Sequence, residues 1–426
     1  MLLKQELEER WFVYQLTDES MFDLYQRGGQ TLYFGMDPTA DSLHLGNLIN
    51  FMSAINFILA GNKLIIIIWG ATGMIWDPWG KDSERSFLDS QLLAHNVQAI
   101  KNQVSLLLSN LEDIVGRDLH SQVNIMDNSI FYEWVSYIDF LRDIGKHITV
   151  NSMMTRETIK KRLTEHGKSI SYTEFSYMLM QGYDFFKLYQ QHGVRLQIAG
   201  SDQWGNITMG TELIRKLSDE SVYGLTAPLI LASNGKKFGK SEGNALWLDS
   251  KKTNVSDMYN YFFNASDEDL PRYLKLLTLY SLDEIHRLVQ EHMLNPQMRT
   301  GQKKLAEGIM QILYGTHTTQ QQMMLATYTT RDPKECHDCI DRWLYPSVIN
   351  ISTSNLIDII VALGLETSRW WAKKTISWWG ISLNGIKVTD PSFVLTDEDW
   401  YQSVAVLRKW KQFPRFVKFV DPVSSD

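Results

Sequence analysis

Two short segments carry side chains suited to holding phosphate groups. His44 and Asn47 stand three residues apart at the start of a predicted helix, so both should lie on one helix face, and a helix start attracts anions. Lys237 and Lys240 flank a flexible Phe-Gly pair, and two ammonium groups on such a loop could close over pyrophosphate. Taken singly, a helix cap and a solvated basic loop explain these segments equally well. Taken together, they predict charge stabilisation at a phosphate.

A third set of polar side chains is spaced along one predicted helix. Tyr177, Gln181 and Asp184 stand at i, i+4 and i+7, which places all three on one helix face. A polar stripe of this kind is usually solvated, but Met and Phe residues flank this one. The stripe therefore predicts the lining of a pocket.

The elements that position these residues alternate between strand and helix, which predicts a parallel α/β sheet. In an open parallel sheet, ligands bind beyond the carboxyl ends of the strands. Four predicted loops gather there, at residues 34–47, 69–81, 199–206 and 233–244. The predicted strands lie at 31–37, 63–70, 123–127 and 225–232, and residues 194–203 are a strand running into a loop. The predicted helices lie within 1–30, from the end of the first loop to 61, and at about 82–116, 206–217 and 257–323, and residues 131–189 are mostly helical.

Composition narrows the class of protein. A chain of 426 residues predicts two or three domains. The longest apolar run, 64–69, is far shorter than the roughly 20 residues of a membrane span. The charged N-terminus lacks the apolar core of a signal peptide, and two cysteines cannot build a disulfide framework, so we expect a cytoplasmic protein. The net charge of −7 counts mildly against nucleic-acid binding but permits a local basic patch.

The segments containing these residues resemble a known family. H-L-G-N resembles the HIGH-type motif of class I aminoacyl-tRNA synthetases, and K-F-G-K-S resembles their KMSKS-type motif. Four longer segments, at 32–46, 140–146, 171–184 and 200–207, resemble bacterial tyrosyl-tRNA synthetases. The similarity covers nearly the whole chain. It implies an enzyme that activates L-tyrosine with ATP to tyrosyl-adenylate and pyrophosphate, then transfers the tyrosyl group to tRNA(Tyr).

The resemblance also implies roles for individual residues. Tyr33 and Asp184 would hydrogen-bond the phenol hydroxyl of tyrosine, although Tyr33 without the family match reads as a core aromatic on a strand. The implied tyrosine-binding set is Tyr33, Asp77, Tyr177, Gln181, Asp184 and Gln203. The implied ATP-binding set is Gly35, Asp37, Thr39, His44, Asn47, Gly200, Asp202, Lys237, Lys240 and Ser241, of which His44, Asn47, Lys237 and Lys240 would be catalytic. The family often has a second histidine at position 47, and asparagine can likewise donate a hydrogen bond.

Architecture and partners follow from the same resemblance. It implies a Rossmann-type catalytic domain over 1–225 with a helical insertion and dimer region at about 115–190. The KFGKS loop and a helical domain would follow over 226–335, and a small α+β S4-like RNA-binding domain over 350–426. The partners would be tRNA(Tyr) and a second copy of the chain, and Mg²⁺ would accompany ATP. No structural metal is expected, because Cys336 and Cys339 are interpreted as ordinary unpaired thiols. The implied tRNA-binding set is Lys81, Arg85, Arg369, Lys373, Lys374 and Lys387.

The tryptophans depart from the family. The chain has 14, and the family has mostly glycine or a small residue at positions 69, 76 and 79, while glycine is also common at 11, 370, 378, 379 and 410. Trp134, Trp204 and Trp247 stand where the family itself has tryptophan, so only some of the tryptophans depart from the family pattern. We hypothesise that the source organism reads UGA as glycine; UGG codons at 69, 76 and 79 would contradict this. If the indoles are real, we expect weak ATP binding and an inactive protein.

Two other functions compete with this interpretation. One is a non-catalytic RNA-binding protein descended from a synthetase, which the loop tryptophans would favour. The other is a synthetase for tryptophan, against which Tyr33 and Asp184 argue, because indole has no hydroxyl to receive them.

Overall fold

The computed structural model describes residues 2–74, 89–156, 159, 170–230, 233, 238–241, 244–327, 348–384, 386–400, 404–409 and 415–420. The chain forms two compact units, one made of residues 1–253 and 265–313 and the other of residues 254–264 and 314–426. Within the described ranges, no helix combines the length and the apolar character needed to cross a membrane.

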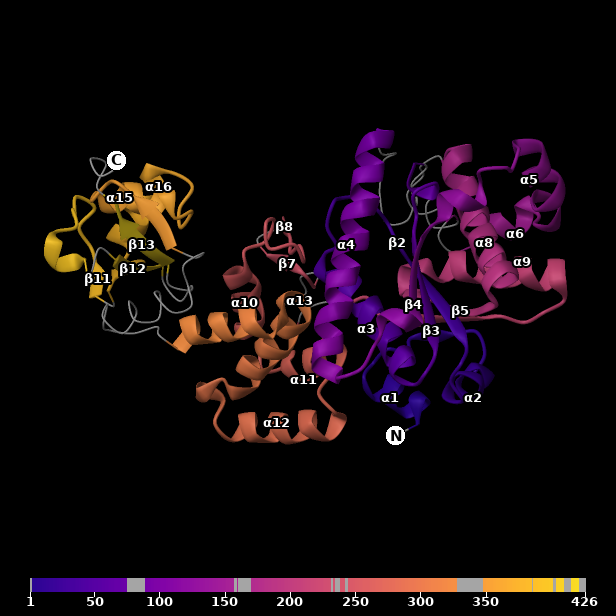
Figure 1. Ribbon diagram of the computed structural model, residues 1–426, viewed down its shortest axis with the longest axis horizontal. Helices are drawn as coiled ribbons and strands as arrows, with labels where there is room; N and C mark the ends of the chain where they lie inside the picture. The colour runs from indigo at the N-terminus through magenta and orange to yellow at the C-terminus, as the bar shows by residue number, and fades with distance from the viewer. Residues whose placement is uncertain are drawn as a thin grey trace. The chain divides into compact units, whose positions relative to one another are not determined.

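A six-stranded sheet forms the centre of the first unit (Figure 1). The strand order is β1-β6-β5-β2-β3-β4; all neighbours are parallel except β1, which is antiparallel to β6. The strands are β1 (Gln15–Leu16), β2 (Thr31–Met36), β3 (Lys63–Ile68), β4 (Val123–Asp127), β5 (Val194–Gly200) and β6 (Tyr223–Ala227). From β2 the chain adds β3 and β4 on one side, whereas β5 and β6 lie on the other. The strand order therefore reverses between β2 and β5.

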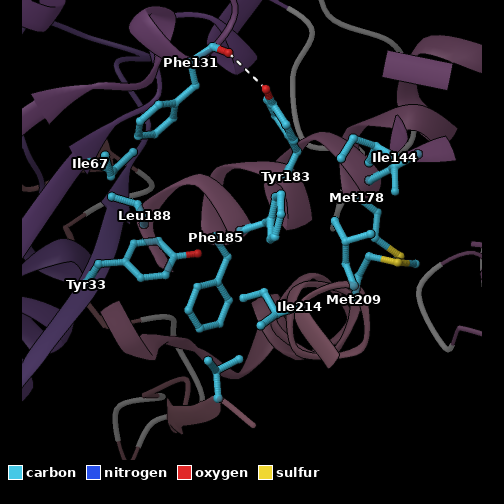
Figure 2. Packing of buried hydrophobic residues seen from close by; sticks show 14 of the residues in the cluster. Tyr33, Ile67, Phe131, Ile144, Met178, Tyr183, Phe185, Leu188, Met209 and Ile214 are labelled. Carbon is cyan, nitrogen blue, oxygen red and sulfur yellow. Dashed lines mark hydrogen bonds between the residues drawn. The ribbon is translucent and has the colours of Figure 1, made fainter. Parts of the chain in front are cut away.

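Apolar side chains cover both faces of this sheet. β3 is almost entirely apolar, and every residue after Lys63 is buried, as expected for a strand with helices on both sides. Alternate residues of β2 point to opposite faces: the ring of Phe34 contacts Phe51 of α3, and the ring of Tyr33 lies 5.0 Å from Phe185 of α8. Figure 2 shows the Tyr33 side, with the tyrosine ring extended from the sheet towards Phe185.

Helices on either side of the sheet complete the first unit. Figure 1 shows the strands between α4 on one side and α8 with α9 on the other. Arg10 joins α1 to the end of α11 by donating to three backbone carbonyls, those of Lys275, Thr278 and Tyr280. The helices are α1 (Leu3–Glu9), α2 (Ser20–Gln26), α3 (Leu45–Leu59), α4 (Ser90–Val115), α5 (Tyr137–Asp143), α6 (Val150–Met154), α8 (Tyr172–His192), α9 (Trp204–Ser218), α11 (Leu270–Leu277) and α12 (Leu282–Leu294). Two further helices, α10 (Val255–Phe263) and α13 (Thr300–Thr327), lie wholly or partly in the second unit.

The second unit ends in a small α+β fold. Its five-stranded sheet has the order β11-β10-β12-β13-β9, and a separate apolar core contains Leu356, Ile376 and Leu407. The elements are β9 (Val348–Ile351), α15 (Leu356–Ala362), α16 (Arg369–Ser377), β10 (Ile381–Leu383), β11 (Ile386–Val388), β12 (Val404–Lys409) and β13 (Arg415–Phe419).

The predicted fold class is confirmed, and two local predictions are wrong. The strand expected at 225–232 begins at Tyr223 and ends at Ala227, because Pro228 has no N–H to continue the ladder. The first thirty residues are not all helical: β1 interrupts them and pairs with the edge of β6. The apparent helical pattern there reflects two short helices on either side of β1.

Candidate active site

A cavity of about 440 Å³ opens beyond the carboxyl ends of the strands, where the strand order reverses between β2 and β5. Ligands of open parallel sheets bind at such a position. Five residues predicted to bind ATP meet there, from loops far apart in the chain. The cavity is lined by Asp37, His44, Gly46, Asn47, Ile49, Asn50, Gly200, Asp202, Pro228, Leu229, Ile230, Phe238, Gly239 and Ala245.

The start of α3 presents a row of donors to this cavity. His44 is the N-cap residue, and its backbone N–H donates to Oδ1 of Asn47 at 3.0 Å, which fixes the asparagine side chain. Because the amide oxygen is used in the cap, the amide nitrogen is the group that can face a ligand. Asn50 lies one turn further along and lines the same cavity. Asn50 was not among the predicted residues, although it continues the three-residue spacing of His44 and Asn47.

The loop after β5 forms another wall. It contains the short helix η5 (Ser201–Gln203), and Asn206 donates to the side-chain oxygen of Gln203 at 2.8 Å. Burial raises the pKa of Asp202, and a hydrogen bond from Gln203 opposes that rise. Asp202 is therefore a partly buried acceptor at the cavity wall.

A set of buried polar side chains, called the chamber below, lies between β2 and α8. Tyr177, Gln181 and Asp184 are all buried on α8, as the spacing of a pocket lining predicts, and Tyr33 reaches the same region from β2. Within the described chain, the hydroxyl of Tyr33 and both amide atoms of Gln181 have no hydrogen-bond partner. Buried groups of this kind are normally satisfied, so they mark a place where a polar ligand fits.

Two neighbours hold the carboxylate of Asp184 at the end of this chamber. Its oxygens accept hydrogen bonds from Nδ2 of Asn128 at 2.9 Å and from the hydroxyl of Tyr132 at 2.8 Å. Burial nevertheless raises the pKa of Asp184 to about 7, against these two hydrogen bonds. Burial, and then the nearby Asp184 carboxylate, raise the pKa of Tyr33 well above its usual value. The two side chains are thus within electrostatic reach of each other.

Several predicted residues fall elsewhere. Six of them lie outside the described residues: Asp77, Lys81, Arg85, Lys237, Cys336 and Cys339. Only the backbone is described for Lys240 and Ser241, which form strand β7 (Lys240–Ser241) and pair with β8 (Asn244–Ala245). Thr39 is exposed and does not line the cavity, and Gly35 faces the ring of Trp69. Among the described residues, no group of three His, Cys, Asp or Glu side chains could hold a metal ion.

The second unit carries the other predicted binding residues. Lys373 of α16 and Lys387 of β11 are exposed. Arg369 forms an ion pair with Asp358, and the ammonium group of Lys374 lies 4.0 Å from the ring centre of Trp370. These four cationic side chains lie on α16 and β11, elements of one small fold.

Comparison with known proteins identifies the family. The family described as tRNA synthetases class I (W and Y) matches residues 26–326, and a tyrosine–tRNA ligase SYY-like C-terminal domain matches residues 345–413. A tyrosine–tRNA ligase of Streptococcus gordonii is 40% identical over 420 residues, covering 97% of this chain and 98% of the relative. The chain belongs to the tyrosine–tRNA ligase family. Tyrosine–tRNA ligase 1 of Streptococcus thermophilus is 39% identical over 97% of this chain and 98% of its own length.

Solved structures agree with this assignment. A C-terminally truncated mitochondrial tyrosyl-tRNA synthetase of Aspergillus nidulans has a TM-score of 0.69 and 26% identity, over 76% of this chain and 92% of that structure. The chain is therefore a class I aminoacyl-tRNA synthetase with tyrosine–tRNA ligase function, which uses ATP. The two competing functions, a tryptophan synthetase and a non-catalytic RNA-binding protein, are set aside, because the full-length relatives are tyrosine–tRNA ligases.

Proposed function

We propose that tyrosine binds in the chamber under α8, that ATP binds in the cavity at the strand ends, and that the two react where β2 joins these spaces. The single observation that carries this proposal is the course of β2, which carries Tyr33 of the chamber and ends one residue before Asp37 at the cavity wall. A carboxylate oxygen of tyrosine attacks the α-phosphorus of ATP, and the bond to pyrophosphate breaks. The ribose hydroxyl at the tRNA 3′ end then attacks the carbonyl carbon, and AMP leaves as the hydroxyl proton is released.

The ATP side of the reaction needs donors and positioning, with no protein nucleophile. His44 and Asn47 donate to phosphate oxygens at the start of α3, and the loop lysines Lys237 and Lys240 close over pyrophosphate. Asp202, a partly buried acceptor, receives the hydroxyls of the nucleotide ribose. Mg²⁺ enters with ATP as the counter-ion of the phosphates.

The tyrosine side of the reaction depends on the buried polar groups of the chamber. The hydroxyl of Tyr33 and the carboxylate of Asp184 receive the phenol hydroxyl of the substrate. Gln181 and Tyr177, with Asp77 from the loop after β3, hold its ammonium group, and Gln203 reaches its backbone. The polar atoms of Tyr33 and Gln181, which have no partner among the described residues, support this assignment.

Binding of tRNA uses both ends of the chain. We keep the predicted division into a catalytic domain over 1–225, a helical domain over 226–335 and an S4-like RNA-binding domain over 350–426. Arg369, Lys373, Lys374 and Lys387 contact tRNA phosphates, and the exposure of Lys373 and Lys387 supports this. Lys81 and Arg85 contact phosphates of ATP or of the acceptor stem. We place the protein in the cytoplasm, where its tRNA substrate is found.

Tyrosine-dependent exchange of pyrophosphate into ATP tests the first step. It should be measured on the chain as printed and on a form with glycine at residues 69, 76 and 79, the loop-glycine form. We expect exchange with tyrosine and none with tryptophan. Alanine at Arg369, Lys373 and Lys387 should lower aminoacylation of tRNA and leave exchange unchanged, because exchange needs no tRNA. If neither folded form exchanges pyrophosphate, the proposed site is wrong.

We also propose that the predicted dimer region, at about 115–190, forms a homodimer interface through its described residues 130–156 and 170–172. Eight large apolar side chains are exposed on these described residues: Ile130, Trp134, Tyr137, Ile138, Leu141, Val150, Met154 and Tyr172. The most exposed of these side chains is that of Trp134, at 91%. A concentration of exposed apolar side chains on a soluble enzyme marks a surface that another protein covers, and a second copy is the simplest partner.

Ile138→Lys should convert the dimer into a monomer, because dimer formation would bury the lysine charge among apolar side chains. Light scattering after size-exclusion chromatography measures the change directly. Leu294→Lys is the matched control, since Leu294 is exposed on α12, far along the chain from this surface. A native protein that is monomeric, or an unchanged mass for Ile138→Lys, would contradict the proposal.

A further inference from the structure

Two helices end in a motif that normally requires glycine. After α1, the backbone N–H of Trp11 donates to Glu8 at 3.0 Å and that of Phe12 to Leu7 at 2.9 Å, while Trp11 has a φ of 66°. These paired bonds, with a left-handed residue just past the helix, form a Schellman motif. A hydrophobic contact usually accompanies it, and both Phe12 and Leu7 are buried here.

The end of α16 repeats the arrangement. The N–H of Trp379 donates to Ile376 at 3.0 Å and that of Gly380 to Thr375 at 2.8 Å, and Trp379 has a φ of 61°. The left-handed conformation brings the β-carbon close to the following carbonyl and costs about 1–2 kcal/mol for an ordinary residue. For a bulky aromatic residue it is a genuine outlier.

The same chain provides an internal comparison. After α3, Gly61 donates to Ile58 and Asn62 to Phe57, and Gly61 has a φ of 86°. After α15, Gly364 and Leu365 make the equivalent two bonds, and Gly364 has a φ of 66°. Four helices thus end in the same hydrogen-bonding pattern. Two have glycine at the left-handed position, and two have tryptophan.

A third tryptophan lies over β2. Trp69 follows β3 and belongs to the apolar cluster that contains Tyr33, and its indole N–H is buried without a hydrogen-bond partner among the described residues. The ring covers Gly35 so closely that a β-carbon there would overlap it. Gly35 lies on β2 between Tyr33 of the chamber and Asp37 of the cavity. The indole therefore lies over the stretch of β2 between Tyr33 and Asp37, where the proposed function places the meeting of the tyrosine carboxylate and the α-phosphate.

We propose that residues 11, 69 and 379 are glycine positions of the working enzyme, and that the residue at 69 determines whether the tyrosine and ATP sites are connected. Glycine at 11 and 379 matches the backbone of the two Schellman motifs. Glycine at 69 removes the indole that lies over β2 between the chamber and the cavity. One cause accounts for all three positions: their codons are read as glycine in the source organism. The part that concerns position 69 rests on the proposed function, whereas the helix ends are independent of it.

Peptide mass spectrometry of the protein purified from its source organism tests the identity of these residues directly. We expect glycine at 11, 69 and 379, together with tryptophan at 204 and 247 as matched controls. Tryptophan at 69, or at both helix ends, would overturn the proposal.

Pyrophosphate exchange tests the role of position 69. With glycine at 76 and 79 in both proteins, Trp69→Gly should raise tyrosine-dependent exchange at least about 100-fold over the protein that keeps Trp69, since misplacing the reacting groups by about 1 Å already costs that much. Trp69→Ala should fall between the two, because a methyl group covers less of β2 than the indole does. Equal exchange by the proteins with Trp69 and with glycine at 69 would overturn this role but leave the proposed function intact. Exchange by neither, in folded proteins, would instead count against the proposed function.

Thermal unfolding tests the helix ends independently of activity. Trp11→Gly and Trp379→Gly should each raise the melting temperature by about 2–4 °C, because the left-handed strain is relieved. Trp371→Gly is the matched control. This tryptophan lies inside α16, where glycine lowers helix stability, so the melting temperature of the Trp371→Gly protein should fall. A fall for Trp11→Gly and Trp379→Gly as well would overturn the assignment.

Discussion

Replacing Asp184 by asparagine in the loop-glycine form is expected to lower kcat/KM for tyrosine about 100-fold, with little change in kcat. The phenol hydroxyl is bound equally in the ground state and the transition state, so the loss should appear in KM. Loss of a buried charged acceptor costs roughly 3 kcal/mol, which corresponds to that factor. Activation of phenylalanine should not fall in parallel, because it has no hydroxyl to lose. The measurement is pyrophosphate exchange with each amino acid.

The same carboxylate should give the enzyme a pH dependence near neutrality. Burial raises the pKa of Asp184 to about 7, so in the free enzyme the group is protonated below that pH and ionised above it. Only the ionised form accepts a hydrogen bond on both oxygens from Asn128, Tyr132 and the substrate. The value of kcat/KM for tyrosine should therefore fall about tenfold for each pH unit below about 7 and reach a plateau above it.

The asparagine variant supplies the control for this pH profile. Asn cannot titrate, so the limb below pH 7 should disappear from Asp184→Asn while any titration of ATP remains. A limb of the same slope in both proteins would show that another group is responsible. If the variant kept its selectivity for tyrosine over phenylalanine, Asp184 would not be the residue that binds the phenol hydroxyl.

Sequence patterns predict which residues line the cavity better than they predict the partners of Asp184 in the chamber, and the reason is physical. His44 and Asn47 are close in sequence, and Gly200 and Asp202 follow a strand, so the rule that ligands bind at the carboxyl ends of parallel strands is enough to bring them together. The partners of Asp184 obey no such local rule. Asn128 comes from the end of β4 and Tyr132 from the segment after it, and only tertiary packing sets them against α8.

Backbone conformation is a second property that the sequence left undetermined. Glycine is the usual residue of a left-handed helix end, so a tryptophan at 11 or 379 gives no sequence signal for a Schellman motif. The comparison with the family marked these positions as unusual, whereas the hydrogen bonds to Glu8 and Ile376 identify what the backbone requires there. The position of the Trp69 ring over Gly35 likewise depends on the pairing of β2 with β3.

Alanine at His44 or at Asn47 is expected to lower the rate of tyrosyl-adenylate formation in the loop-glycine form by about 10²- to 10³-fold. Each residue supplies one donor to charge that develops on the phosphate oxygens, and removing one such donor typically costs this factor in kcat. The KM for tyrosine should change little, because the chamber under α8 is untouched. Single-turnover formation of the adenylate measures the step without product release.

The capping role of Asn47 requires a second variant, because alanine removes the cap and the donor together. The side-chain oxygen of Asn47 completes the capping box by accepting from the N–H of the N-cap residue His44, and the carboxylate of Asn47→Asp keeps an acceptor there. It cannot donate to a phosphate and adds a negative charge there. We therefore expect Asn47→Asp to melt at the native temperature and yet to lose at least as much rate as alanine, whereas Asn47→His, which restores a donor, should recover most of it. If Asn47→Asp were fully active, the side chain would serve only to cap α3, and stabilisation of the phosphate would fall to His44 and the loop lysines.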